Sequence, residues 1–133
     1  PEIIYTLREK LNMEQKVFES TGGLHASALF DLTGHFIMFR EDVGRHNALD
    51  KLIGAVFQSD SLPLSKNILL LSGRASFELI QKAHMAGIAL VVAIGAPSSL
   101  AVKLAEESNI TLLGFVGNNK FNIYTGLDRI RIS

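Results

Sequence analysis

The stretch NILLLSGRASFELIQKAHMAGIALVVAIGAPSSLAVKLAEESNITLLGFVG (67–117) decides the fold, because short apolar runs alternate in it with amphipathic segments. Such runs are typical of strands that are covered on both faces, and the segments between them have helical spacing. Strands that alternate with helices predict βαβ units and a mainly parallel sheet. The expected strands are 67–71, 88–94 and 111–116, and the expected helices are 75–86 and 99–108, with Pro97 at or near the start of the second.

The residues on either side of this stretch complete an α/β fold. Helical spacing at the start of the chain predicts a helix. Apolar and polar residues then alternate on both sides of a Thr33-Gly34 turn, which predicts a hairpin, and helical spacing returns after it, which predicts a second helix. The chain is therefore predicted to be a single domain, 1–133, with a three-layer α/β/α sandwich and a mixed sheet. The expected elements are a helix from about residue 3 to about 12, strands over 24–30 and 35–40, a helix capped by Asp42, and a short strand over 121–124.

The composition predicts a folded domain and excludes several classes of protein. Of 133 residues, 47% are hydrophobic and 20% are charged, which excludes a disordered chain. Thirteen basic residues balance thirteen acidic ones, so we expect no nucleic acid and no membrane as partners, and any anion site to be local. The longest apolar stretch, 88–95, is too short to cross a bilayer. The absence of cysteine excludes disulfides and thiol nucleophiles within this chain and favours a cytoplasmic setting.

The segment EDVGRHNALDK (41–51) is the first candidate for a binding site. Arg45 and His46 are expected in the first turn of a helix, where unpaired N–H groups and the helix dipole favour an anion. The planar guanidinium of Arg45 suits a phosphate or a carboxylate. In the structural alternative, Asp42 only caps the helix and His46 is partly buried. Arg45 then pairs with Glu41.

The segment SGRASFE (72–78) is the second candidate. Gly73 allows close approach to the backbone at the end of a buried strand. An arginine at a helix N-terminus is unfavourable for the helix dipole, so Arg74 indicates that an anion completes the site. In the structural alternative, Arg74 is solvated or pairs with Glu78, four residues further on.

The segment GAPSS (95–99) is a weaker candidate for the same site. Its Ser98 and Ser99 offer hydroxyls but no charge, so simple helix capping is the better interpretation. In open α/β sheets, ligands bind beyond the carboxyl ends of the strands, where the helices begin. We therefore expect these three segments to meet at one end of the sheet.

The segment TGGLH (21–25) and the other histidines form no recognisable catalytic or metal motif. Gly22 and Gly23 let a loop pass close to a ligand, and His25 begins a strand. The four histidines lack the local pairing of metal ligands, so we expect no bound metal. The serines lack a His-Asp partner set, and there is neither a Walker A motif nor a G-x-G-x-x-G motif. The residues alone predict an anion-binding domain and no catalytic residue.

Five segments resemble stretches of the FdhD/NarQ family, and they follow one another along the chain in the same order as in that family. The most specific is the polar string EDVGRHNALDK (41–51), and the resemblance covers the chain from about Phe18 onward. The other four are TGGLHASALF (21–30), SGRASFELIQKAHMAGI (72–88), APSSLAVKLAEE (96–107) and TLLGFVGNNKFNIYT (111–125).

The resemblance implies a sulfur carrier that serves molybdenum enzymes. Members of this family take sulfur from a cysteine desulfurase and pass it to the molybdenum bis(molybdopterin guanine dinucleotide) cofactor before its insertion into formate dehydrogenase. Their carrier thiols lie in a Cys-x-x-Cys loop upstream of the TGG-H segment, whereas this chain has no cysteine. Either the chain begins after that loop, which we expect, or it is a thiol-free relative. The resemblance also implies a homodimer and a C-terminal domain that holds the GDP-like part of the cofactor.

The resemblance further implies a cytidine-deaminase-like fold. Zinc deaminases have His-x-Glu at the start of the helix after the hairpin and Pro-Cys-x-x-Cys at the next strand–helix turn. Here these places are RHN (45–47) and SGRAS (72–76), so the Glu and both Cys are absent. We infer that the former zinc pocket binds the guanine nucleotide or the pyrophosphate. The residues expected at this site are Gly22, Gly23, His25, Asp42, Arg45, His46, Asn47, Ser72, Gly73, Arg74, Ser76, Ser98 and Ser99.

Two functions of other classes remain as alternatives. One is an active nucleoside or base deaminase, which needs bound zinc. The other is a zinc-free scaffold that acts as a non-catalytic chaperone or dimerisation module for a molybdoenzyme.

Overall fold

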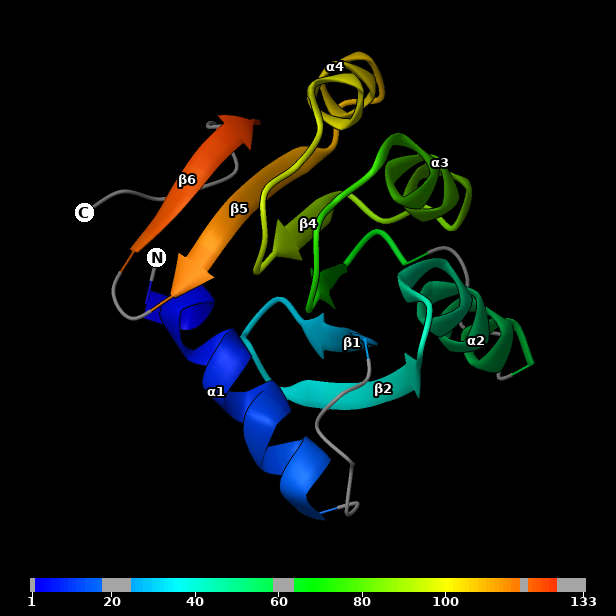
Figure 1. Ribbon diagram of the computed structural model, residues 1–133, viewed down its shortest axis with the longest axis vertical. Coiled ribbons are helices and arrows are strands. Elements are labelled where there is room, and N and C mark those ends of the chain that lie inside the picture. Colours follow the sequence, from blue (N-terminus) through cyan, green and yellow to red (C-terminus); the bar gives the residue numbers. More distant parts are fainter. Residues whose placement is uncertain (1, 18–24, 59–63, 118–119, 127–133) are drawn as a thin grey trace.

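A computed structural model describes residues 2–17, 25–58, 64–117 and 120–126 of the chain (Figure 1). These residues form four helices and six strands. In chain order the elements are α1 (Glu2–Val17), β1 (His25–Asp31), β2 (Phe36–Asp42), α2 (Arg45–Gln58), β3 (Asn67–Leu71), α3 (Phe77–Met85), β4 (Leu90–Ala93), α4 (Ser99–Glu107), β5 (Thr111–Gly117) and β6 (Lys120–Thr125).

The six strands form one mixed sheet in the order β2-β1-β3-β4-β5-β6. β3 pairs with β4, and β4 with β5, in parallel. The β2–β1, β1–β3 and β5–β6 pairs are antiparallel. The prediction of a mixed sheet is confirmed, whereas the expectation of a mainly parallel sheet is wrong. Periodicity along one strand does not report the direction of its neighbour, and both the hairpin and β6 join the parallel core in the antiparallel sense.

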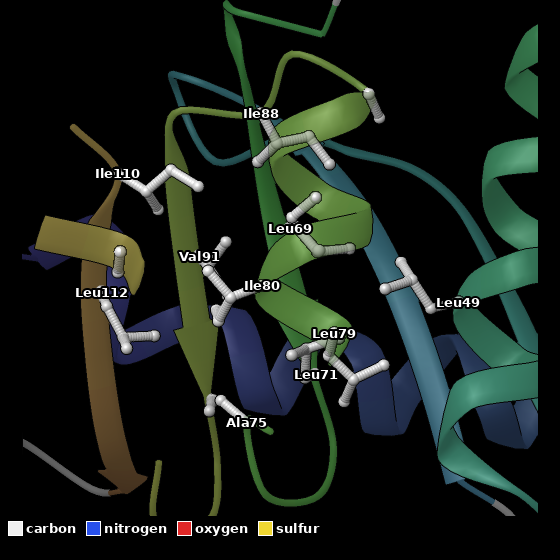
Figure 2. Packing of buried hydrophobic residues seen from close by; sticks show 14 of the residues in the cluster. Leu49, Leu69, Leu71, Ala75, Leu79, Ile80, Ile88, Val91, Ile110 and Leu112 are labelled. Carbon is white, nitrogen blue, oxygen red and sulfur yellow. The ribbon is translucent and has the colours of Figure 1, made fainter. Parts of the chain in front are cut away.

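Helices cover the two faces of the sheet, as the three-layer prediction requires (Figure 1). α1 packs on one face through Ile4, Leu7 and Leu11, whose spacing places them on one stripe of the helix. α2, α3 and α4 pack on the opposite face. Figure 2 shows this second layer, in which the labelled residues include Leu49, Leu69, Leu71, Ala75, Leu79, Ile80, Ile88, Val91, Ile110 and Leu112.

The central strands are buried on both faces of the sheet. Leu69, Leu70 and Val92 are fully buried at the centre of the sheet, and each such side chain stabilises the fold by about 1.5–3 kcal/mol. Because successive residues of a strand point to opposite faces, Leu69 contacts the layer of α2–α4, and Leu70 contacts the layer of α1. This double burial explains why the central strands have continuous apolar sequences.

Several predicted boundaries shift in the structure. α1 continues to Val17, beyond the predicted end near Asn12, and Gln15 in its last turn donates a hydrogen bond to Glu41 (2.8 Å). α3 begins at Phe77 with Ser76 as its N-cap, so Ser76 precedes the first turn. α4 begins at Ser99 after the N-cap Ser98, which leaves Pro97 outside that helix. Within the described ranges, none of the four helices is long and apolar enough to span a bilayer.

Candidate functional site

The predicted segments meet at one end of the sheet, where β2, β3 and β4 end and β1 begins. His25 at the start of β1 pairs with Asp42 at the end of β2. On the other side of β1, the N–H of Ser72 donates to the carbonyl of Ala26 (3.0 Å). The loop after β3 also contacts the loop after β4, because Gly95 N–H donates to Gly73 O (3.0 Å).

The loop before α2 is held by the side chain of Asp42. Its Oδ1 accepts a hydrogen bond from Gly44 N–H (3.0 Å), and its Oδ2 forms an ion pair with Lys51 Nζ (2.8 Å). The first hydrogen bond along the helix runs from Ala48 N–H to Gly44 O (3.0 Å), so the prediction that Asp42 is the N-cap is wrong. Asp42 instead closes a turn one step earlier, as Asp side chains do when they bond the backbone two residues on. Arg45 is the first residue of α2, as predicted.

These contacts keep the Asp42 carboxylate ionised. Its hydrogen bond with Lys51, the Gly44 N–H and, more weakly, the Asn47 side chain lower the pKa of Asp42 from 3.8 to about 2. The prediction placed Asn47 against a ligand, and the structure turns its side chain toward this carboxylate. A carboxyl group with a lowered pKa stabilises the folded protein above its ordinary pKa, and this contribution is lost as the pH falls through about 2.

We expect the Asp42 carboxyl group to titrate near pH 2, and Lys51→Met to move its pKa back toward 3.8. The measurement is the carboxyl ¹³C shift of Asp42 from about pH 5 to below pH 2. Lys82→Met is the matched control, because Lys82 pairs with Asp50 (2.7 Å) and not with Asp42. An Asp42 pKa near 3.8 in the unmodified protein would contradict the ion pair.

Arg45 lies beside His25 and Gly73 at the centre of this end of the sheet. A Cβ added to Gly73 would be 3.2 Å from Nδ1 of His25 and 4.0 Å from Cδ of Arg45, so Gly73 makes room for both side chains. The Nε of Arg45 is buried, and within the described residues it has no hydrogen-bond partner. Nor does Arg45 form an ion pair with any described carboxylate, so the alternative of an Arg45–Glu41 pair is not what the structure shows. A buried N–H group without a partner is costly, and a bound anion would satisfy it.

His46 links the beginnings of α2 and α3. Its Nε2 lies 3.3 Å from Oγ of Ser76 and 3.9 Å from Oε2 of Glu78. Ser76 Oγ also accepts from Leu79 N–H (3.4 Å), which is the N-cap bond of α3. Glu78 therefore approaches His46, and the proposed structural pairing of Glu78 with Arg74 is not formed. The two helix N-termini are thus held side by side.

Ser76→Ala is expected to lower the free energy of unfolding by more than the roughly 1 kcal/mol that a serine N-cap typically contributes. The reason is that Ser76 also contacts His46. Ser98→Ala is the matched variant, because Ser98 caps α4 by accepting from Ala101 N–H (3.1 Å). Urea unfolding of both variants compares the losses. A loss for Ser76→Ala that is no larger than the loss for Ser98→Ala would show that the His46 contact contributes nothing.

The loop after β4 supports the loop that carries Arg74. A Cβ on Gly95 would lie 3.1 Å from the backbone C and O of Gly73 and 3.2 Å from Cγ of Arg74. Ser98 N–H donates to Ala75 O (2.9 Å), which adds a second link between the loops. Arg74 itself is exposed, and the described residues offer it no ion pair. Two arginines that have no carboxylate partner among the described residues therefore lie at this end of the sheet.

With this geometry established, comparison with known proteins decides the family. The sequence profile of the FdhD/NarQ family matches residues 1–131. The chain belongs to the FdhD/NarQ family. It is 57% identical over 132 residues to the sulfur carrier protein FdhD of Streptomyces avermitilis, which covers 99% of this chain and 47% of that protein. It is 50% identical over 129 residues to the FdhD of Sulfolobus acidocaldarius, which covers 97% of this chain and 51% of that protein. The chain thus spans about half the length of these relatives.

One solved structure supports the same assignment, and a second shares the fold. A formate dehydrogenase accessory protein from Desulfotalea psychrophila matches with a TM-score of 0.85 and 26% identity, over 97% of this chain and 57% of that one. A guanine deaminase from Nitrosomonas europaea matches with a TM-score of 0.60 and 15% identity, over 88% of this chain and 76% of that one. The second likeness shows the fold alone, and it confirms the prediction of a deaminase-like fold for this FdhD/NarQ chain.

Several predicted site residues have structural roles or lie outside the description. Gly22 and Gly23 are not among the described residues, so their role stays a prediction. Ser72 Oγ accepts a hydrogen bond from Ala26 N–H (2.8 Å), which extends the β1–β3 pairing. Ser98 caps α4, in agreement with the capping interpretation, and Ser99 is an exposed first residue of that helix. Ligand contact by these residues remains untested.

Sequence reasoning missed three residues that organise the site in this FdhD/NarQ chain. Lys51 pairs with Asp42, Glu78 approaches His46, and Gly95 gives the loops room to pack. Lys51 stands within the polar string 41–51, but nothing in the spacing says that it folds back over nine residues to Asp42. The string contains both residues, but their pairing depends on the fold.

A cavity of about 420 Å³ lies at the opposite end of the sheet, where β5 begins and β6 ends. It is lined by Ala105, Glu106, Asn109, Ile110, Ile123, Tyr124, Thr125 and Gly126. None of the predicted site residues that the structure describes lines it. In the described part of the chain, no three His, Cys, Asp or Glu side chains lie together as metal ligands would.

Proposed function

We propose that this chain is the nucleotide-binding domain of an FdhD-type sulfur carrier, and that it binds the guanine nucleotide part of the molybdenum bis(molybdopterin guanine dinucleotide) cofactor. The observation that carries the proposal is the buried Nε of Arg45, which has no partner among the described residues. Family membership supports the sulfur-carrier part of the proposal, because relatives with about 50% identity or more are named sulfur carrier protein FdhD.

The chemistry of the site suits a phosphate group. Arg45 stands at the beginning of α2, where the helix N-terminus favours negative charge, and Arg74 precedes α3 by three positions. A guanidinium binds phosphate oxygens through two parallel N–H groups, which would satisfy the buried Nε of Arg45. Gly73 has no side chain, which leaves room for Arg45 and His25 beside it. The site therefore matches the pyrophosphate of a nucleotide in charge and in donors.

The role of the whole protein follows by extension. Because the chain has no cysteine, we propose that it holds the cofactor and that a thiol outside these 133 residues carries the sulfur. We propose a cysteine desulfurase as the sulfur donor, a formate dehydrogenase as the recipient of the cofactor, a homodimer as the assembly, and the cytoplasm as the compartment. The name of the Desulfotalea psychrophila relative, a formate dehydrogenase accessory protein, supports the recipient.

Isothermal titration with GDP, ADP and inorganic phosphate tests the nucleotide proposal. We expect GDP to bind and ADP to bind more weakly. Equal affinity for GDP and ADP would contradict recognition of guanine and leave only phosphate recognition. No binding of any of the three would contradict the assignment of the cofactor site to this domain and would favour the non-catalytic scaffold.

A further inference from the structure

Lys51 of α2 is fully engaged in contacts with the end of β2. Its Nζ lies 2.8 Å from Asp42 Oδ2 and donates to the carbonyl of Glu41 (3.1 Å). The Lys51 side chain is half exposed, while that of Asp42 is 17% exposed. An isolated surface ion pair contributes little to stability. The effect that we consider for this pair is the position of the turn before α2.

Asp42, which forms the ion pair with Lys51, contacts the segments that carry Arg45 and His25. Asp42 Oδ1 accepts from Gly44 N–H (3.0 Å), and Gly44 immediately precedes Arg45. Asp42 is also the register partner of His25 across the β1–β2 pair. Lys51 lies more than one turn further along the helix that Arg45 begins. It therefore ties the body of α2 to the turn that sets the helix start.

We propose that Lys51 is a positioning residue for the ligand site: through Asp42, it fixes the 42–44 turn and thereby the guanidinium of Arg45. This inference rests on the proposed nucleotide binding. The proposal assigns Lys51 no direct ligand contact, because two of its three N–H donors are directed to Asp42 and Glu41.

Lys51→Met is expected to raise the Kd for GDP by about tenfold, the lower end of the roughly 10- to 100-fold loss that metal sites show when a partner that orients a ligand is removed. Lys51→Arg keeps the charge and is expected to restore most of the affinity. Lys82→Met is the matched control, because it removes a comparable ion pair, between Lys82 of α3 and Asp50 of α2 (2.7 Å), that does not involve Asp42. The control is expected to leave Kd unchanged.

Asp42→Asn separates positioning from direct contact. The asparagine keeps an oxygen for the Gly44 N–H and loses the ion pair with Lys51. If Lys51 acts through Asp42, Asp42→Asn weakens GDP binding as much as Lys51→Met does, and the double variant is no weaker than either. If Asp42→Asn retains its affinity while Lys51→Met loses it, Lys51 contacts the nucleotide directly and the inference is overturned.

A measurement without ligand keeps the two proposals distinguishable. The ¹H–¹⁵N resonance of Arg45 Nε is expected to shift or broaden in Lys51→Met and to stay in place in Lys82→Met. An unchanged resonance in Lys51→Met overturns the positioning role, whatever GDP does. Failure of the unmodified protein to bind GDP would sink the proposed function alone, because the Arg45 resonance would still report on the turn.

Discussion

Arg45→Ala is expected to weaken GDP binding by about 1.5–3 kcal/mol, roughly 10- to 150-fold, because it removes charge-assisted hydrogen bonds to a phosphate. The stability of the free protein is expected to stay the same or to rise. In the free protein the Arg45 Nε is buried without a described partner, so its removal relieves a cost. A loss of affinity without a loss of stability is the signature of a residue kept for a ligand.

The matched control for this variant is Arg40→Ala. Arg40 is exposed on β2 and donates to the backbone carbonyl of its neighbour Phe39 (2.7 Å), so it carries the same charge outside the site. GDP affinity is measured by titration calorimetry and stability by urea unfolding. If Arg40→Ala and Arg45→Ala weaken binding equally, the effect is general electrostatics and Arg45 has no special role.

Gly95→Ala is expected to destabilise the fold by about 1–3 kcal/mol, the usual cost of forcing an extra methyl group into a packed interior. The added Cβ would lie 3.1 Å from backbone atoms of Gly73, and backbone cannot rotate away as a side chain can. Alanine also lowers the conformational entropy of the unfolded chain, and this effect offsets less than about 1 kcal/mol of the cost. Because Gly73 and Arg74 are displaced together, GDP affinity is expected to fall as well.

Gly54→Ala is the control for the glycine substitution. Gly54 lies on α2, and apart from the nearby backbone of that helix no described atom lies within 4 Å of an added Cβ, so alanine is expected to stabilise the helix by about 0.5–1 kcal/mol. Thermal unfolding of both variants provides the comparison. A Gly95→Ala protein as stable as the unmodified one would mean that the two loops are not in tight contact.

The sequence predicts the central β3–β4–β5 part of the fold well, because strand and helix periodicities are local properties of the chain. Residues 67–71 and Ser99 as the start of α4 lie where the pattern predicts them. The place of β1 between β2 and β3 could not be predicted, because a hairpin can pair with a sheet through either of its strands. The further extent of α1 was missed because residues after Asn12 lack the apolar stripe, although residues 13–17 include strong helix formers.

The site could be predicted as a set of segments but not as a set of contacts. Arg45 and Arg74 were identified from their positions at predicted helix starts, and the structure places both near Gly73. The contacts of His46 with Ser76, and of Asp42 with Lys51, join residues that are 30 and nine positions apart. Such contacts depend on how the helices pack, which local spacing does not encode.

The most direct test of the central claim is the ¹H–¹⁵N spectrum of the chain during a GDP titration. The account predicts that the largest shift changes occur at the amides of residues 44–47 and 72–76, where α2 and α3 begin. Amides that line the cavity at the other end of the sheet, such as those of Asn109 and Ile110, should stay in place. Shift changes concentrated at that cavity, or none anywhere, would contradict the assignment of the nucleotide site to Arg45 and its neighbours.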